Sequence, residues 1–178
     1  DAPAQSFSDD FVFGNYNDKK KILEFINKVD LITYEFENIP FDTLNEINKL
    51  KKVLPKPSVN RLIQHRLAEK DFVNKLNIRT TRYVSIEKKS DIETLEDFLP
   101  GILKTTTMGY DGKGQYPIKK ITDLDNLNLD FSKGYVLEKL VKLKKEISVI
   151  ITRFGNNNYG IYEPIENTHQ DQILNHSK

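Results

Sequence analysis

The sequence has no cysteine and no tryptophan, and Met108 is its single methionine. Without cysteine, the chain can form neither a disulfide bond nor a thiolate metal site, which suits a reducing cytoplasm. No apolar run approaches the roughly 18 residues that a membrane-spanning helix needs. The segment from Asp1 to Gln5 lacks the basic and hydrophobic regions of a signal peptide. These absences predict a cytoplasmic protein without a membrane partner.

The sequence also lacks an excess of charge of either sign. Its 27 Lys and Arg residues nearly balance its 26 Asp and Glu residues, so the net charge is +1. So small a charge provides no general attraction for nucleic acid. Apolar residues make up 38% and charged residues 30%, as in a soluble globular protein with a core. Because the chain begins with Asp1 and not with methionine, we expect a processed chain or a part of a longer protein.

The first third of the chain alternates between helical and extended patterns. Residues 18–29 carry an apolar stripe at helical spacing, with Asp18 as the expected cap. Leu31–Glu37 is short and partly alternating, which predicts a strand. Phe41–Leu50 has apolar residues every third position and predicts a second helix. Helix, strand and helix in this order favour a parallel α/β layer.

Two prolines mark a junction after this layer. Pro55 and Pro57 indicate a domain boundary near residue 56, so we expect one domain over 1–56 and another over 57–178. Pro57 suits the first turn of a helix, and the helix that follows is expected to break near Ala68.

From about Thr80 the sequence changes to short apolar segments separated by turn residues. This pattern predicts an α+β region whose strands are largely antiparallel. A helix from Ile92 to Phe98, capped by Ser90, is expected among the strands. The expected strands are Tyr83–Ile86, Ile102–Thr105, Gln115–Ile118, Tyr135–Lys139, Glu146–Arg153 and Tyr159–Glu163.

A lysine inside an apolar strand precedes a glycine-rich loop. Lys104 follows Ile102 and Leu103, and the segment Gly109–Gln115 contains three glycines in its first six residues. Glycines let backbone N–H groups approach an anion closely, and a lysine adds a point charge for phosphate. The lysine precedes the glycines, so this is not a Walker P-loop. Taken alone, the pattern is explained better by a hairpin with a glycine-rich turn.

Two carboxylates follow the loop at positions that suit a nucleoside. The strand Tyr135–Lys139 runs into Glu138-Lys139-Leu140-Val141, and Glu146 follows a lysine-rich link. Backbone groups at the strand end could read an adenine edge, and Glu146 could accept hydrogen bonds from ribose hydroxyls. Taken singly, each carboxylate is more simply an exposed strand charge.

Together these features resemble a known superfamily. A strand lysine, a glycine-rich flap, E-x-x-[IV] and a further glutamate occur in the order of the nucleotide contacts of ATP-grasp enzymes. The segments Tyr34–Pro40 (YEFENIP), Gly109–Gln115 (GYDGKGQ) and Tyr162–Gln170 (YEPIENTHQ) resemble the 5-(carboxyamino)imidazole ribonucleotide synthetase family. The resemblance is collinear over essentially the whole chain. It implies part of a Rossmann-like pre-ATP-grasp domain in 1–56, followed by part of an ATP-grasp domain in 57–178.

The resemblance implies a role for each matching residue on the nucleotide side. Arg66 lies near the phosphates, Lys104 contacts ATP, and Glu146 contacts the ribose. Without the resemblance, Arg66 is better explained as part of a solvated helix face, and His169 as an ordinary surface residue. The implied nucleotide-binding residues are Arg66, Lys104, Gly109, Tyr110, Asp111, Gly112, Lys113, Gly114, Gln115, Glu138, Lys139, Leu140, Val141, Glu146 and His169.

The second substrate has its own candidates. The resemblance places Tyr110 and Asp111 at the imidazole ribonucleotide, as the candidate catalytic residues. Strand alternation puts Glu35 and Glu37 on one face near the carboxyl end of the predicted strand, where α/β sheets bind ligands. Both could accept hydrogen bonds from ribose hydroxyls, and a solvated strand end explains either of them equally well.

The implied activity is that of a carbon–nitrogen ligase of purine biosynthesis, which uses ATP and bicarbonate to carboxylate aminoimidazole ribonucleotide through carboxyphosphate. The family is homodimeric and needs Mg²⁺, whose ligands are expected after Lys178, so this stretch alone is not expected to be active. One alternative is another ATP-grasp ligase, such as a formate-using glycinamide ribonucleotide transformylase or a biotin carboxylase. The other is a nucleotide-binding module without catalysis.

Overall fold

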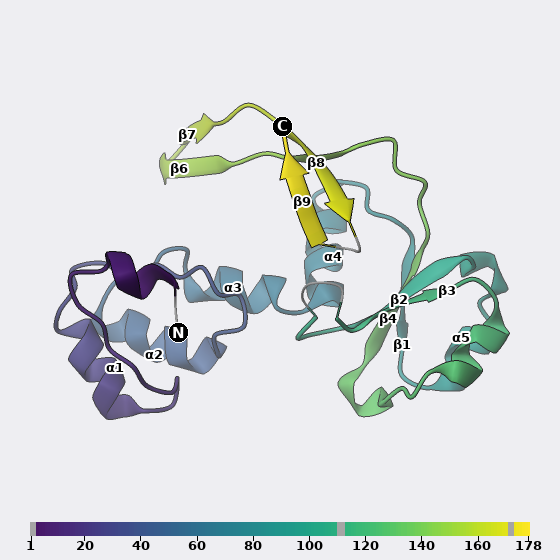
Figure 1. The fold of residues 1–178 in the computed structure, drawn as a ribbon, viewed down its shortest axis with the longest axis horizontal. Helices are drawn as coiled ribbons and strands as arrows, with labels where there is room; N and C mark the ends of the chain where they lie inside the picture. Colours follow the sequence, from purple (N-terminus) through teal and green to yellow (C-terminus); the bar gives the residue numbers. More distant parts are fainter. Residues whose placement is uncertain (1–2, 110–112, 171–172) are drawn as a thin grey trace. The chain divides into compact units, whose positions relative to one another are not determined.

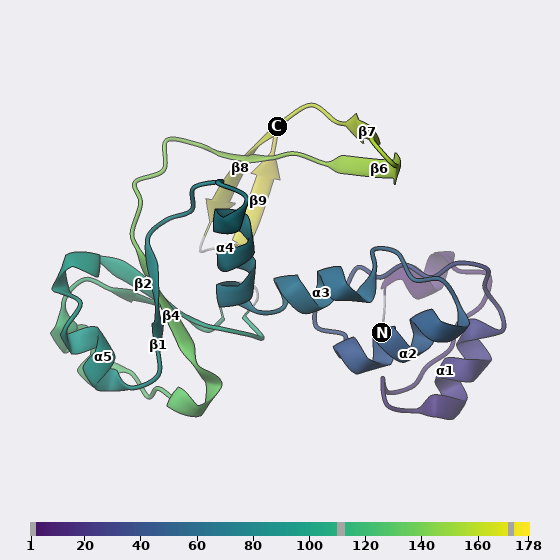
Figure 2. The same cartoon turned by 180° about the vertical axis from the view of Figure 1, so that it is seen from behind.

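The computed structural model describes residues 3–109, 113–170 and 173–178. The chain divides into two compact units, Asp1–Asn77 and Ile78–Lys178. The elements in the described part of the first unit are helices, whereas the second unit is built mainly from antiparallel strands with short helices (Figures 1 and 2). No helix in the described ranges is both long and apolar enough to cross a membrane.

The first unit packs short helices around a small apolar core. The Asp18 side chain accepts hydrogen bonds from the backbone N–H groups of Lys20 and Lys21, both at 3.1 Å, which confirms the predicted cap. The core consists of Ile26, Ile32, Ile39, Leu44, Ile47 and Val53. The helices are η1 (Pro3–Phe7), α1 (Lys19–Ile26), α2 (Phe41–Leu50), α3 (Pro57–Ile63) and α4 (Arg66–Lys75).

The strand predicted at Leu31–Glu37 is wrong for the described structure. Only Ile32 pairs there, in a single parallel bridge with Val53. The Ile32 N–H donates to the Lys52 carbonyl at 3.0 Å, and the Leu54 N–H donates to the Ile32 carbonyl at 2.9 Å. A strand needs a continued ladder, and no described neighbour extends this one. The bridge is nevertheless parallel, as the predicted layer requires.

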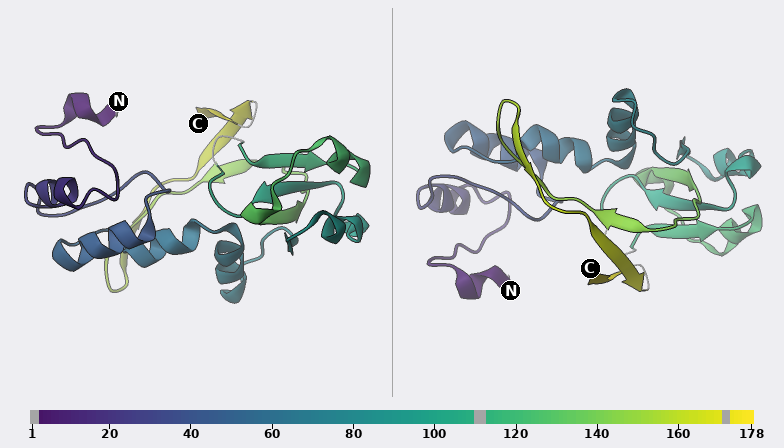
Figure 3. Two further views of the ribbon diagram at one scale, coloured as in Figure 1. Left: turned by 90° about the horizontal axis from the view of Figure 1, so that it is seen from below. Right: turned by 90° about the horizontal axis from the view of Figure 1, so that it is seen from above.

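The helix break expected near Ala68 lies three residues earlier. His65 has an extended backbone, with φ −123° and ψ 104°, and separates α3 from α4. Its Nδ1 accepts the backbone N–H of Ala68 at 3.4 Å, so His65 is the N-cap of α4. The two helices therefore point in different directions (Figures 1 and 3).

The second unit contains a four-stranded antiparallel sheet with the order β1-β4-β2-β3. Its buried core includes Leu103, Tyr135 and Leu137, packed with Ile92 of α5 and Leu124 of η3. The strands confirm four predicted segments, with β2 beginning one residue earlier than expected. They are β1 (Tyr83–Ile86), β2 (Gly101–Thr105), β3 (Gln115–Ile118) and β4 (Tyr135–Lys139), accompanied by the 3-10 helices η3 (Ile121–Asn126) and η4 (Phe131–Lys133).

The helix predicted from Ile92 to Phe98 with a Ser90 cap is wrong. The structure has a shorter α5 (Lys89–Glu93) and a separate 3-10 turn, η2 (Glu96–Phe98). The Asp91 carboxylate accepts the backbone N–H of Glu87 at 3.0 Å and that of Lys88 at 3.1 Å. These bonds satisfy donors ahead of the helix, so α5 starts before Ser90.

The last third of the chain contains two further small sheets. The segment expected as one strand, Glu146–Arg153, is two strands, because β5 and β6 pair with different partners. The strand expected at Tyr159–Glu163 is shifted toward its N-terminal side as β7. Strands β8 and β9 were not predicted. The bounds are β5 (Glu146–Ser148), β6 (Ile151–Gly155), β7 (Asn158–Ile161), β8 (Ile165–Gln170) and β9 (Ile173–Ser177).

Two hydrogen bonds define the root of the glycine-rich loop. The Thr105 N–H donates to the Gly114 carbonyl at 2.9 Å, and the Thr106 N–H donates to the Gly134 carbonyl at 3.1 Å. Gly114 has φ +70°, and a Cβ added there would lie 2.6 Å from Thr105 Oγ1. Only glycine fits this position without strain.

We predict that Gly114→Ala destabilises the protein by about 1–3 kcal/mol, because alanine must adopt a left-handed backbone and displace Thr105. Urea unfolding at equilibrium measures the change. Gly155→Ala is the matched control, since its φ is not positive and nothing lies within 4 Å of the added Cβ. Equal losses of stability in the two variants would contradict this account of the loop root.

Candidate functional site

The four-stranded sheet presents two chemically different faces. Leu103 and Leu137 are directly opposite each other in the β2–β4 register, and both are fully buried in the core. Successive side chains of a strand point to opposite faces. Lys104 and Glu138 therefore belong to the other face, which is where the sheet can carry polar groups.

An ion pair joins the two strands on that face. Lys104 Nζ lies 2.9 Å from Glu138 Oε2, and their side chains are only 21% and 10% exposed. Because Ile102 is opposite Glu138 and Lys104 is opposite Val136, the pair is a diagonal cross-strand contact. Charges so withdrawn from water are costly unless paired. The structure thus brings together two predicted site residues as partners of each other, which sequence reasoning missed.

The segment after Glu138 is held by neighbouring backbone. The Lys139 N–H donates to the Arg82 carbonyl and the Leu140 N–H to the Pro100 carbonyl, each at 2.9 Å. The Lys139 ammonium donates to the Leu99 carbonyl at 3.2 Å. The side chain of Lys139 is therefore engaged with this carbonyl, and its own backbone carbonyl accepts the Thr81 hydroxyl at 2.7 Å.

Glu146 and His169 come together across the β5–β8 pair. Glu146 is opposite Asn167 in the register, which places His169 one diagonal step away. His169 Nδ1 lies 3.5 Å from Glu146 Oε2, with side chains 34% and 47% exposed. The contact is an ion pair when the imidazole is protonated. Glu146 and His169, which the sequence placed separately on the nucleotide side, are thus neighbours. The sequence could not indicate this contact, because it did not predict strand β8.

The structure describes some of the candidate binding residues in the Gly109–Gln115 loop but not others. Gly109, Lys113, Gly114 and Gln115 are described, and Gln115 begins β3 opposite Lys104. The candidate residues Tyr110, Asp111 and Gly112 lie outside the described residues.

A polar pocket of about 380 Å³ lies at the loop root. Thr105, Gly114, Tyr116 and Tyr135 line it together with Lys133. Burial raises the pKa of Tyr135, whose hydroxyl oxygen accepts the Asp130 N–H at 3.2 Å. Sequence reasoning did not identify this pocket, because its walls come from segments distant along the chain.

Arg66, Glu35 and Glu37 belong to the first unit. Arg66 is the first residue of α4, directly after the His65 cap. Glu35 and Glu37 are both exposed. The structure describes the two units separately, so it does not test the predicted grouping of these residues with Lys104.

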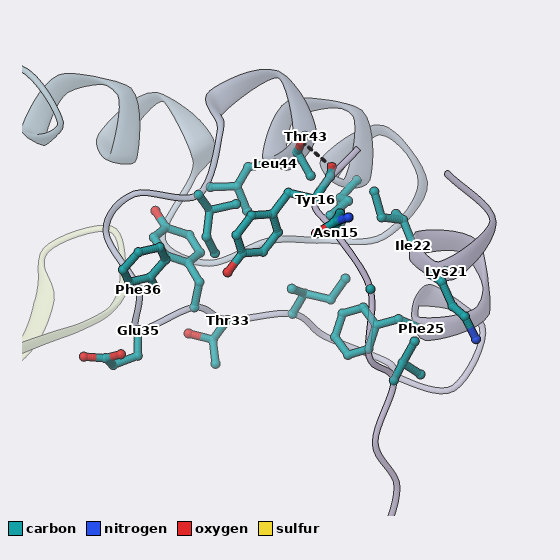
Figure 4. Close-up of a pocket in the computed structure, with 16 residues that line it drawn as sticks. Asn15, Tyr16, Lys21, Ile22, Phe25, Thr33, Glu35, Phe36, Thr43 and Leu44 are labelled. Carbon is teal, nitrogen blue, oxygen red and sulfur yellow. Dashed lines mark hydrogen bonds between the residues drawn. The ribbon is translucent and has the colours of Figure 1, made fainter. Parts of the chain in front are cut away.

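A pocket of about 350 Å³ adjoins Glu35 in the first unit. Figure 4 shows the Glu35 carboxylate at one end of the lining residues, with Phe25 and Ile22 at the other. Tyr34 also lines it; burial raises the pKa of Tyr34, and its hydroxyl has no hydrogen-bond partner among the described residues. Sequence reasoning had assigned Tyr34 no role. The sequence signal that could have identified Tyr34 was the alternating pattern of Leu31–Glu37.

Within residues 3–109, 113–170 and 173–178, no group of three or more acidic or histidine side chains is arranged to hold a metal ion. What the described residues offer is a lysine–glutamate pair, a glycine-rich loop root and a glutamate–histidine pair. This donor set suits a phosphorylated ligand with hydroxyl groups.

Comparison with known proteins agrees with this chemistry. The model of the ATP-grasp domain matches residues 71–178, and that of the ribonucleotide synthetase preATP-grasp domain matches residues 1–64. The N5-carboxyaminoimidazole ribonucleotide synthase of Staphylococcus aureus strain MRSA252 is 35% identical over 178 residues, covering 98% of this chain and 47% of that protein. The chain thus spans about half the length of this curated relative.

Solved structures show the same fold. The N5-carboxyaminoimidazole synthetase of Staphylococcus aureus complexed with ADP superimposes with a TM-score of 0.87 at 32% identity, covering 97% of this chain and 47% of that one. An N5-carboxyaminoimidazole ribonucleotide synthetase in an ADP complex has a TM-score of 0.90 at 31% identity, covering 99% and 48%. Because the ATP-grasp model alone matches more than half of its residues, the chain belongs to the ATP-grasp family.

Proposed function

We propose that the protein containing this chain is an ATP-dependent carbon–nitrogen ligase that carboxylates 5-aminoimidazole ribonucleotide with bicarbonate in purine biosynthesis. The observation that carries the proposal is the shielded Lys104–Glu138 pair beside a glycine-rich loop, in a chain of the ATP-grasp family. The relative from Staphylococcus aureus, which bears the name of this activity, supports the choice of substrate.

On the nucleotide side, each described residue has a distinct task. Lys104 supplies a positive charge for phosphate, and Glu138 holds that ammonium in place. Glycines at the loop root let backbone N–H groups face the phosphates. Glu146 accepts hydrogen bonds from ribose hydroxyls, and His169 restrains its carboxylate. Backbone groups of Leu140 and Val141 read the adenine edge, and Arg66 completes the phosphate contacts.

On the ribonucleotide side, Glu35 and Glu37 accept hydrogen bonds from ribose hydroxyls. Their exposure leaves both carboxylates accessible to a ligand. Tyr110 and Asp111 orient the imidazole and its exocyclic amine, as their place in the family's loop motif implies. This division puts nucleotide contacts at Lys104 and ribonucleotide contacts at the tip of the same loop.

The proposed chemistry has two stages. The γ-phosphoryl group of ATP passes to a bicarbonate oxygen, which yields carboxyphosphate and ADP. The exocyclic amine then attacks the carboxyl carbon, directly or after carbon dioxide has formed, and phosphate departs. The protein contributes positioning and charge neutralisation to such a transfer. Mg²⁺ would add further charge neutralisation, and we place its ligands in the sequence after Lys178, as in the family.

Three wider features belong to the same proposal. The domain boundary lies near Pro57, with 1–56 contributing to the preATP-grasp domain and 57–178 to the ATP-grasp domain. The intact protein is a cytoplasmic homodimer, and residues 1–178 are inactive alone. The order of the two domains is supported by the models that match residues 1–64 and 71–178. The other features rest on the family resemblance alone.

We expect the intact protein to incorporate labelled bicarbonate into aminoimidazole ribonucleotide only when ATP is present. Mass spectrometry of the product measures this directly. Incorporation of formate into glycinamide ribonucleotide instead would favour the sibling ligase. Nucleotide binding without any product would favour a binding module.

The two halves of the site should separate by mutation. Lys104→Ala should weaken ATP binding, because it removes a phosphate contact. Asp111→Asn keeps the side-chain shape and should depress carboxylation by roughly 30- to 1000-fold, since one catalytic hydrogen bond is worth about 2–4 kcal/mol. Calorimetry measures ATP binding, and mass spectrometry measures product. Loss of ATP binding in Asp111→Asn as severe as in Lys104→Ala would refute this division.

Glu138→Gln should raise the KM for ATP about fivefold or more and destabilise the fold by about 1–3 kcal/mol, because it leaves the Lys104 ammonium shielded without a carboxylate. The double variant Lys104→Met/Glu138→Gln should recover part of this stability, since it removes both charges of the pair. Urea unfolding and steady-state kinetics measure the two effects.

Glu166→Gln is the control for that change. Glu166 pairs with Lys145 at 2.5 Å, but both side chains are about half exposed, at 48% and 57%. An exposed pair contributes little, so stability should be nearly unchanged. If Glu166→Gln lowers the free energy of unfolding as much as Glu138→Gln does, shielding from water does not strengthen the Lys104–Glu138 pair.

A further inference from the structure

Gln64 lies between α3 and α4 and makes two side-chain hydrogen bonds to one distant turn. Its Nε2 donates to the Glu37 carbonyl at 2.7 Å and to the Ile39 carbonyl at 2.6 Å. A primary amide nitrogen has two N–H groups, so both donors are used. Its own backbone N–H donates to the Asn60 carbonyl at 3.0 Å, which fixes Gln64 at the end of α3.

Asn60, one helical turn earlier, strengthens the same attachment. Its Nδ2 donates to the Ile39 carbonyl at 3.1 Å, and its side chain is fully buried. The Ile39 oxygen therefore accepts two hydrogen bonds and uses both lone pairs. Two amides four residues apart, one in α3 and one at its C-cap, thus determine the direction of the Glu37 and Ile39 carbonyls in the 37–39 turn.

This attachment matters because the preceding segment has little other support. Ile32 is bridged to Val53, but no described ladder continues through residues 33–37. Backbone direction sets where a side chain points, and a segment outside a ladder depends on its remaining hydrogen bonds. The two exposed carboxylates at Glu35 and Glu37 lie between the Ile32 bridge and the α3 amides.

We propose that Gln64 is a positioning residue for the ribonucleotide, which holds the backbone at Glu37 and Ile39 so that the Glu35 and Glu37 carboxylates face the ribose. The inference rests on the proposed function. It adds a residue that touches no substrate and acts through the turn that it binds.

Gln64 also lies two residues before Arg66, so its competing role would be to position the start of α4. If Gln64 served chiefly to start α4, its loss would disturb the nucleotide contact of Arg66. The two roles differ in the substrate whose KM changes: the ribonucleotide for the first and ATP for the second.

The experiment compares Gln64→Met and Gln64→Glu in the intact protein by steady-state kinetics. Both variants keep the side-chain length and remove the N–H donors, and the glutamate also faces two carbonyl oxygens. We expect the KM for aminoimidazole ribonucleotide to rise about tenfold and that for ATP to change less than about twofold. Gln64→Lys restores N–H donors and should recover part of the loss.

Gln5→Glu is the matched control, because Gln5 is exposed and undergoes the same chemical change. It should leave both KM values unchanged. Hydrogen exchange of the peptide spanning 33–41, measured without substrates, should be faster in Gln64→Met than in the unsubstituted protein.

Each other outcome decides against the proposal. Equal rises in both KM values would assign Gln64 to α4, and unchanged values would deny it any role. Unfolding of both Gln64→Met and Gln64→Glu, seen by circular dichroism, would make its role purely structural. Absence of turnover in the unsubstituted protein would refute the proposed function itself, whereas turnover with unaffected variants would refute this inference alone.

Discussion

A lysine and a glutamate withdrawn from water constrain the four-stranded sheet of the second unit. Burying either charge of the Lys104–Glu138 pair costs free energy unless it is paired, which favours the register of β2 and β4 that joins them. That register also places Leu103 against Leu137 on the opposite face. One side of the sheet is therefore an apolar core, and the other is available for a charged ligand. A one-residue slip would bury the charges and expose the core.

The candidate residues outside this sheet depend on side chains and backbone groups that bind each other across the chain. The loop root is held by Thr105 and Thr106, which donate to carbonyls in two separate segments. The turn after Glu37 is held by the amide of Gln64. The loop root continues from the end of β2, where Thr105 pairs with Tyr135 of β4, whereas hydrogen bonds without a described strand ladder hold the 37–39 turn. Such positions can combine a precise backbone with exposed side chains, as a binding site requires.

These arrangements make the proposed reaction physically reasonable. Phosphoryl transfer asks a protein for fixed cations and fixed backbone donors more than for covalent chemistry. In the proposed site Lys104 is such a cation, and its contact with Glu138 at 2.9 Å restrains its position. The pairing of Glu146 with His169 restrains a carboxylate in the same way. Preorganisation of this kind reduces the cost of ordering the site when the ligand binds.

The sequence by itself determined the helices α1 and α2, the strands of the main sheet and the family motifs, because apolar spacing and caps are local signals. It did not determine that Leu31–Glu37 lacks a strand ladder or that His65 separates two helices. Nor did it determine that β5 and β6 pair with different strands. Nor could it reveal that Lys104 pairs with Glu138, or that Gln64 holds Glu37. The tertiary structure decided the strand pairings, the Lys104–Glu138 pair and the Gln64 contacts, because their partners lie far away in the sequence.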